Sequence, residues 1–442
     1  MRKAVYIPIM QYTSNRHQTF LECLCRHFTV IISKLSPIEL RSNNIEWVED
    51  ILTEKVACQR DAITVSDFEN EYAQLCLFAK ERLRIILPND LHDKTVGDEF
   101  SQYRTELQTI YKEAIQLLEL SRRRKVDFVI ASCDYAYLSR PAVHMAKLLG
   151  IHTVDVEHGY FGMQLYPSAW EPPATLQRGV ADTVILDNDL EALLFKENRN
   201  PGSSQQYLPL GTPMDHAFRE SKLSKKDAFK MLQLNENRKT VVLALSWSIP
   251  FNLDGLLATH RHEVAFVDSV LSVLSNNGKY EQLQVILKLH PAIKNFKEDS
   301  HVIRFYKSRL KKFKMENRSI VTVTNMNDVF PCADVVIGWT MSSVLFDAAM
   351  EGIPAANYIA TKELNNFKED PNRHSEMAKA DLIKILLSEE DLEEYLDLIL
   401  ANTYRDLYQK RKDEFIKKWH INRQSVEQKS MNIVNWLQNF SN

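Results

Sequence analysis

Short apolar segments alternate along most of the chain with stretches in which apolar residues recur every three or four positions. In the first half this pattern predicts strands at 3–9, 28–32, 126–132, 153–157 and 183–186, with helices at 14–27 and 139–149. Strands that alternate with helices are typical of a parallel sheet with crossover helices. The sequence therefore predicts an α/β fold that begins with a βαβ unit.

The same pattern starts again after a polar, lysine-rich stretch at 220–226, which we interpret as a linker. Beyond it we expect strands at 239–246, 283–289, 319–323, 334–337 and 355–358, and helices at 262–274, 301–315 and 342–350. The sequence therefore predicts a first domain at 1–218 and a second, doubly wound domain at 227–400.

Two further regions have helical spacing. Residues 45–125 are charged and poor in glycine, which predicts a helical insertion in the first domain. From Ala378 onward apolar residues again recur every three or four positions. We expect C-terminal helices at 401–442 to pack back across both domains.

Composition agrees with two domains, because 442 residues with 45% hydrophobic content can bury two cores. A net charge of -3 and a pI near 6.5 give no global signal for nucleic-acid binding. Six scattered cysteines lack the spacing of a zinc site, so we expect reduced thiols and no metal. No apolar run is long enough to span a bilayer. The expected location is cytoplasmic, at most at the inner face of the cell membrane.

The segment around Ser342 and Ser343 is the most informative about chemistry. Here an apolar strand runs through Gly338 into the start of a helix. Free N–H groups at a helix N-terminus, together with two hydroxyls, hold a phosphate without a lysine. A serine pair before an apolar run is also an ordinary helix cap. The segment predicts either a nucleotide or phosphoryl ligand or a structural cap.

A second strand end indicates the same place. The expected strand at 283–289 is followed by His290 and Pro291, and ligands of open α/β sheets bind beyond the carboxyl ends of strands. Lys288 and His290 would donate hydrogen bonds to a diphosphate. The alternative is a turn that depends on the proline alone.

Two residues on the helix after Ser343 extend this expected donor site. Asp347 lies one turn further along, so we expect it to support the site rather than to touch substrate. Glu351 precedes Gly352 and is a candidate for binding ribose hydroxyls. It would equally suit a solvated helix end.

Glu157 and His158 stand at the end of the expected strand at 153–157, beside Gly159. Because a histidine has a pKa of about 6.5, it can accept a proton from a hydroxyl at neutral pH. The alternative interpretation is that His158 only forms a hydrogen bond with the end of the strand. Glu157 is either the base itself or a residue that orients the ring.

Basic residues gather at 307–314 and at 405–418. Such faces are usually solvated, and the alternative is contact with anionic lipid at a membrane surface.

Four features in order resemble a known group, the metal-independent GT-B transferases that build bacterial capsules, lipopolysaccharides and teichoic acids. The features are His158-Gly159, Gly211–Asp215, Lys288–Pro291 and Ser342–Asp347. Relatives in that group include sialyl- and Kdo-transferases and the CDP-glycerol glycerophosphotransferases. The resemblance covers residues 126–358. The acidic-acidic-Gly base motif of the sialyltransferases is absent.

The resemblance implies a GT-B fold, in which two Rossmann-like doubly wound domains face a cleft. It implies that His290, Ser342 and Ser343 bind the donor's phosphates and that His158 or Glu157 is the catalytic base. The implied activity is an inverting, metal-independent transfer of a sugar from a CMP-, CDP- or UDP-linked donor, without a cofactor. The implied acceptor is a hydroxyl of a bacterial surface glycan or of its lipid-linked precursor.

Three other functions stay open. One is transfer of glycerol phosphate from CDP-glycerol, and another is a UDP-N-acetylhexosamine 2-epimerase. An epimerase needs several acidic residues in its cleft, and the sequence offers only Glu157, Asp134 and Asp254 as candidates. The third is a non-catalytic subunit that binds a nucleotide or a glycan. Turnover separates the enzymes from the subunit, and dependence on an acceptor separates a transferase from an epimerase.

Overall fold

The computed structural model divides into two compact units. The first comprises Met1–Gly162, Tyr166–Asp215 and Ile421–Asn442, and the second Met163–Leu165 and His216–His420. The residues that the structure describes are 1–7, 17–32, 40, 42–53, 116–117, 119–121, 123–132, 140–156, 181–198, 204–213, 223–245, 256–290, 301–339, 342–359, 376–401, 404–421 and 424–440.

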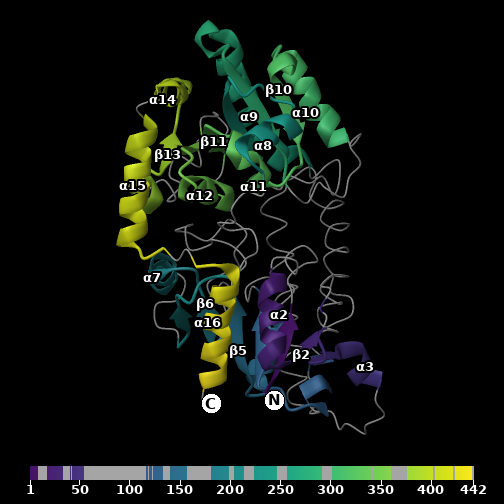
Figure 1. Ribbon diagram of the computed structural model, residues 1–442. Coiled ribbons are helices and arrows are strands. Elements are labelled where there is room, and N and C mark those ends of the chain that lie inside the picture. The colour runs from purple at the N-terminus through teal and green to yellow at the C-terminus, as the bar shows by residue number, and fades with distance from the viewer. Residues whose placement is uncertain are drawn as a thin grey trace, which may run out of the picture. The chain divides into compact units, whose positions relative to one another are not determined.

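A parallel sheet forms the centre of the first unit (Figure 1). Within the described residues its strand order is β3-β2-β1-β4-β5-β6-β7. The strands are β1 (Lys3–Ile7), β2 (Thr29–Ile32), β3 (Ile45–Trp47), β4 (Phe128–Ala131), β5 (His152–Val156), β6 (Thr183–Ile185) and β7 (Gln206–Leu208). The order reverses between β1 and β4, as in a doubly wound sheet.

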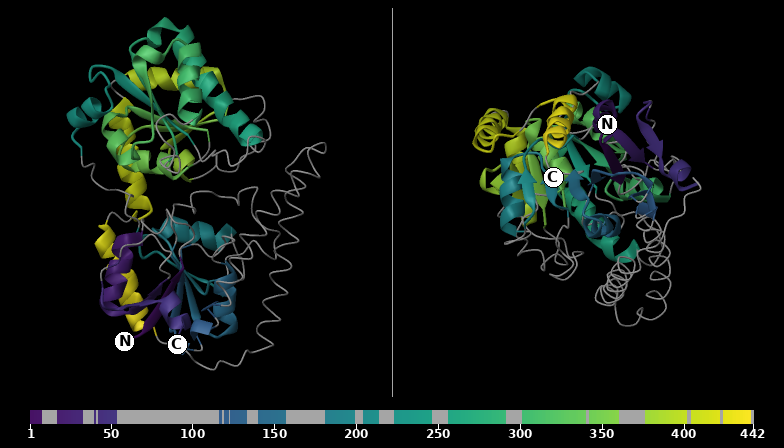
Figure 2. Two further views of the ribbon diagram at one scale, coloured as in Figure 1. Left: turned by 90° about the vertical axis from the view of Figure 1, so that its right-hand side faces the viewer. Right: turned by 90° about the horizontal axis from the view of Figure 1, so that it is seen from below.

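Successive residues of each strand point to opposite faces, and each face has its own core. Tyr6 and Phe128 pack on one face with helices α2 (Gln18–His27) and α16 (Val426–Asn439), which Figure 2 shows side by side. Val5 and Val129 pack on the other face with α6 (Arg140–Leu148). This unit also contains the helices α3 (Val48–Thr53) and α7 (Asp189–Asn198).

The second unit has its own parallel sheet, in the order β10-β9-β8-β11-β12-β13 among the described residues. Its strands are β8 (Lys239–Ala244), β9 (Leu283–Lys288), β10 (Ser319–Thr322), β11 (Val335–Gly338), β12 (Ala355–Tyr358) and β13 (Ile383–Leu386). Its helices are α8 (Lys225–Met231), α9 (Leu256–Asn276), α10 (His301–Lys312), α11 (Met326–Val329), α12 (Ser343–Met350), α13 (Glu376–Lys379), α14 (Glu389–Leu400) and α15 (Tyr404–Lys418). The predicted α/β class with two doubly wound sheets is confirmed.

The last helices belong to different units. Helix α15 lies in the second unit, where the hydroxyl of Tyr408 donates a hydrogen bond to the carbonyl of Leu382 at 2.6 Å. Helix α16 belongs to the first unit, where the guanidinium of Arg2 donates to the carbonyl of Phe440 at 2.7 Å.

The structure corrects the sequence reading at three short strands. Residues 45–47, expected as the start of the helical insertion 45–125, form the edge strand β3. Residues 383–386, expected to be helical, form β13, and β7 was not predicted. Helical conformation does occur in 48–53 and at the described positions between 116 and 123, and most of the insertion lies outside the described residues.

Candidate functional site

The two predicted phosphate-binding motifs follow strands of the same sheet. The register places Ala244, the last residue of β8, opposite both Lys288 at the end of β9 and Gly338 at the end of β11. Neighbouring strands lie about 4.8 Å apart, so these two strand ends are about 10 Å from one another. His290 and Ser342 follow them in sequence. Both motifs therefore start from the carboxyl edge of the second sheet, where α/β proteins bind ligands.

Ser342 is the N-cap residue of α12, yet its hydroxyl does not cap the helix. Its backbone is extended, with φ -119° and ψ 158°, and its side chain makes no cap hydrogen bond. By contrast, the side chains of Ser224, Ser388 and Ser425 each accept a hydrogen bond from the amide three residues further on. The ordinary cap interpretation therefore does not describe Ser342. The amide three residues further on, that of Leu345, donates instead to the carbonyl of Ser342 at 3.0 Å. The hydroxyl of Ser342 therefore takes no part in the cap.

A buried carboxylate holds Trp339, the first residue after β11. Glu263 on α9 is 1% exposed. It accepts a hydrogen bond from the hydroxyl of Tyr306 at 2.6 Å and another from the indole N–H of Trp339 at 3.3 Å. Trp339 directly follows β11, so Glu263 holds the chain where it leaves the sheet. Glu263 was not predicted as a site residue, although an acidic residue on the apolar face of a helix is a signal of this kind.

Lys288 and His290 differ in how they are placed. Lys288 is 4% exposed, and its ammonium group donates a hydrogen bond to the carbonyl of Leu289. His290 is half-buried just after β9. Of the two, His290 is the more accessible to a ligand.

Asp347 and Glu351 lie at different depths along α12. Asp347 is 8% exposed, one turn into the helix. Glu351 is exposed and is the C-cap residue, at the opposite end from Ser342. A helix of this length spans about 12 Å, so the structure does not bring Glu351 to the N-terminus of α12. Its role toward a ribose stays a prediction.

Asn357 on β12 was not singled out in the sequence, although it is a lone amide in an apolar strand. It lies opposite Gly338 in the register and is 0% exposed. Neither atom of its amide has a hydrogen-bond partner in the part of the chain that the structure describes. An unsatisfied buried amide costs about 1–3 kcal/mol. Its position beside the end of β11 is one where an additional polar group would be stabilising.

The candidate bases Glu157 and His158 lie outside the described residues, immediately after β5 ends at Val156. The described part of this edge is polar and buried. The hydroxyl of Tyr6 shares a hydrogen bond of 2.7 Å with Nδ1 of His17, and Asp155 is buried on β5. Burial raises the pKa of Tyr6 and the charge of Asp155 adds to the rise, while a hydrogen bond with Ser132 opposes it.

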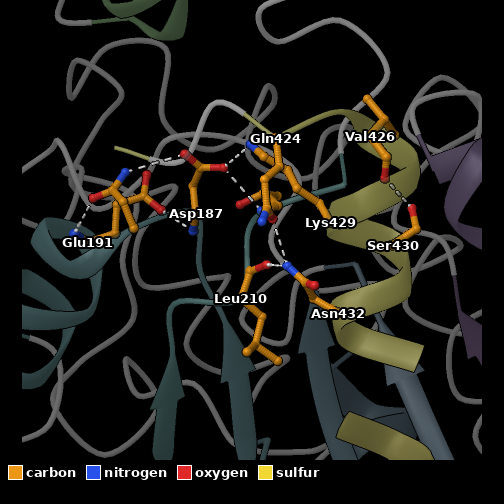
Figure 3. A network of polar contacts seen from close by, with 10 residues as sticks. Asp187, Glu191, Leu210, Gln424, Val426, Lys429, Ser430 and Asn432 are labelled. Atoms are coloured by element: carbon orange, nitrogen blue, oxygen red, sulfur yellow. Dashed lines mark hydrogen bonds and ion pairs between the residues drawn. The ribbon is translucent and has the colours of Figure 1, made fainter. Parts of the chain in front are cut away.

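A buried ion pair closes the same edge at the end of β6. Figure 3 shows Lys429 of α16 directed at Asp187. The two groups are 2.5 Å apart, and their side chains are 3% and 0% exposed. Asp187 also accepts a hydrogen bond from the amide of Thr212 at 3.1 Å. On the same helix, the amide of Asn432 donates to the carbonyl of Leu210 at 3.2 Å.

Among the described residues, no group of three or more His, Cys, Asp or Glu side chains is arranged to hold a metal ion. Cys23, Cys25 and Cys332 are buried free thiols. Burial raises the pKa of Cys25 to about 12 and that of Cys332 to about 11. In the same part of the chain, no helix is both long and apolar enough to cross a membrane.

Comparison with known proteins identifies the fold. No protein-family model matches the sequence, and no curated protein matches it. Among solved structures, the Staphylococcus aureus MnaA complex with UDP aligns with a TM-score of 0.55 and 11% identity, over 99% of this chain and 96% of that one. A glycotransferase of kitacinnamycin gives 0.53 and 9% identity, covering 98% of both chains. A UDP-N-acetylglucosamine 2-epimerase gives 0.52 and 12% identity, covering 98% of this chain and 95% of its own. The chain has the GT-B fold that these glycosyltransferases and epimerases share.

Proposed function

We propose that the protein is an inverting, metal-independent glycosyltransferase. It would move a sugar from a CMP-, CDP- or UDP-linked donor to a hydroxyl of a bacterial surface glycan or its lipid-linked precursor. The observation that carries the proposal is the N-terminus of α12, where Ser342 leaves its hydroxyl out of the cap at the carboxyl edge of the second sheet.

The donor phosphates would bind at this N-terminus. The amides of the first turn and the hydroxyls of Ser342 and Ser343 are donors suited to phosphate oxygens, and the helix dipole favours negative charge there. His290 follows the neighbouring motif and would donate to the same phosphates. Asp347 and Glu263 support the helix and the turn before it. These groups would stabilise the charge that develops on the leaving phosphate.

The acceptor hydroxyl would lose its proton to His158 or Glu157. The oxygen then attacks the anomeric carbon as the bond from that carbon to the phosphate breaks. The proton passes to the base and the electron pair to the departing nucleotide. One such displacement inverts the anomeric centre.

The test of donor binding is a thermal-shift panel with CMP, CDP, UDP, GDP and TDP. We expect one nucleotide to raise the melting temperature by several degrees, because ligand at about 100 times its Kd adds about 2.7 kcal/mol. Ser342→Ala/Ser343→Ala should abolish the shift. Ser388→Ala is the matched control, since it removes a serine cap far along the chain and should keep the shift. No shift with any nucleotide contradicts the proposal.

A turnover assay then separates the open alternatives. The selected nucleotide sugar is incubated with and without a glycan acceptor, and the released nucleotide is measured. Release that depends on acceptor supports a transferase. Conversion of the sugar without an acceptor indicates an epimerase, and binding without turnover indicates a subunit. If CDP-glycerol is the only donor that supports turnover, the protein transfers glycerol phosphate.

A further inference from the structure

Helix α10 carries charge of one sign only. It contains five Lys and Arg residues and no acidic one. Helix α15, the other basic segment of the second unit, contains six basic and three acidic residues. Its cations alternate with these acidic residues, and two of them are paired, Arg411 with Asp381 at 2.7 Å and Lys418 with Glu376 at 3.1 Å.

The basic residues of α10 form one exposed face. Arg304, Lys307 and Lys311 are exposed and lie three and four positions apart, so they share a side of the helix. Tyr306 and Leu310 are buried on the opposite side. The helix is therefore amphipathic, with its apolar side fixed on the second unit.

Few of these charges are neutralised by the protein. Arg309 and Lys312 share one carboxylate, Asp268 on α9. Within the described residues, no ion pair includes Arg304, Lys307 or Lys311. The face thus presents uncompensated positive charge to its surroundings, on a chain whose total charge is -3.

An exposed aromatic ring stands on the flank of α10 that carries Arg309. Phe305 is 41% exposed. It packs edge-on against Tyr306, with ring centroids 5.3 Å apart. Tyr306 is itself held by Glu263 through its hydroxyl. Phe305 is therefore an exposed apolar side chain on a rigid support, beside the guanidinium of Arg309, which lies 6.0 Å from the centroid of its ring.

The helix also lies at a margin of its unit. It connects β9 to β10 and packs against β10, which is the outermost strand of the described sheet (Figure 1). The helix thus covers an outer strand of the sheet and not the central strands.

We propose that α10 docks the second unit on a membrane surface rich in anionic phospholipid. The cations would be drawn to the lipid phosphates, and Phe305 would enter the boundary between headgroups and acyl chains. Each Lys or Arg near an anionic surface strengthens binding about fivefold. A nucleic acid fits less well, because the charged face is a single helix about 18 Å long on an acidic chain.

The test is co-sedimentation of the full chain with vesicles of phosphatidylcholine alone or with about 30% phosphatidylglycerol. We expect binding to the anionic vesicles only, and its loss at high salt. Arg304→Glu/Lys307→Glu/Lys311→Glu should weaken the partition coefficient at least about 100-fold. Phe305→Ser should weaken it without changing the charge.

The matched control places the same charge change on α15. Arg405→Glu/Lys410→Glu/Lys417→Glu alters exposed cations and should leave most of the binding intact. Circular dichroism and thermal melting check that each variant is folded. If the triple glutamate variant of α10 does not fold, Lys307→Gln/Lys311→Gln replaces it in the binding test. Equal loss in the α10 and α15 variants would overturn the proposal, as would equal binding to neutral vesicles. Binding to RNA or dextran sulfate with none to vesicles would assign the face to an acidic polymer instead.

Discussion

The carboxyl edges of the two sheets differ in whether their polar side chains are bonded within the protein. At the end of β6 in the first unit, the chain closes the edge with its own side chains, since Lys429 of α16 meets the buried Asp187. At the end of β11 in the second unit, Ser342 begins a helix without capping it. An edge that the protein satisfies internally contributes to stability. An edge at which a serine hydroxyl takes no part in the helix cap is suited to a ligand.

The largest expected effect is on the closed edge. Lys429→Met leaves the carboxylate of Asp187 buried without its ammonium partner, which costs about 3–5 kcal/mol. We expect an earlier unfolding transition in urea. The double variant Asp187→Asn/Lys429→Met removes both charges and should recover much of the loss. If Lys429→Met unfolds at the wild-type urea concentration, the ion pair does not close this edge.

Replacement of Glu263, which holds Trp339 before α12, should give the next largest effect on stability. Glu263→Leu leaves the hydroxyl of Tyr306 and the indole N–H of Trp339 without their acceptor, which costs about 1–3 kcal/mol. Because Trp339 precedes α12, nucleotide affinity should fall as well. Glu263→Gln keeps an acceptor and is the control. Unchanged affinity in a destabilised Glu263→Leu protein would separate Glu263 from the site.

Serine caps within the same chain provide the sharpest contrast. Ser388→Ala and Ser425→Ala each remove a cap hydrogen bond and should cost about 1 kcal/mol. Ser342→Ala removes no such bond, so it should lower the free energy of unfolding much less. It should also weaken the binding of the nucleotide. Urea unfolding measures the first quantity and calorimetric titration the second. A loss of about 1 kcal/mol in Ser342→Ala without any change in affinity would make it an ordinary cap.

The smallest expected effect is on the pH dependence of stability and concerns the amino edge of the first sheet. Helix α16 and Phe440, the residue after it, also cover this edge. There His152 stacks on Phe440, with ring centroids 4.1 Å apart. Burial lowers the pKa of His152 and the charge of Lys147 lowers it further, while Asp182 opposes both. The unfolded chain therefore binds more protons, and the contribution of His152 to stability is lost as the pH falls from about 6.5 through its folded pKa.

The measurement is urea unfolding at pH 7 and at pH 5. His152→Gln should reduce the difference in stability between these two values. A difference equal to that of the wild type would show that His152 is not the group that titrates.

Long central elements were predictable from the sequence, and short edge strands were not. Residues 239–244 and 283–288 are apolar runs bounded by polar residues, so their periodicity identifies buried strands. β3 and β7 are only three residues long, too short for any period to be recognised. β13 lies between helices and carries Lys384, which resembles a helical pattern.

The candidate site was predictable where its residues stand in local motifs. His290 and Ser342 follow strand ends, and the order of strands along the chain sufficed to place both at one edge. Glu263 acts from a helix 76 residues before Trp339, and only the folded sheet brings the two together. Asn357 gave only a weak signal, an amide within an apolar strand. Glu351 is the C-cap residue of α12, which agrees with its alternative interpretation as a solvated helix end, and its role toward a ribose stays a prediction.

The most direct test of the central claim is a crystal structure of the protein with the nucleotide that gives the largest thermal shift. The account predicts phosphate oxygens within hydrogen-bond distance of the first amides of α12 and of the hydroxyl of Ser342, with His290 on the same phosphates. A nucleotide bound elsewhere, with the N-terminus of α12 in contact only with solvent, would contradict it.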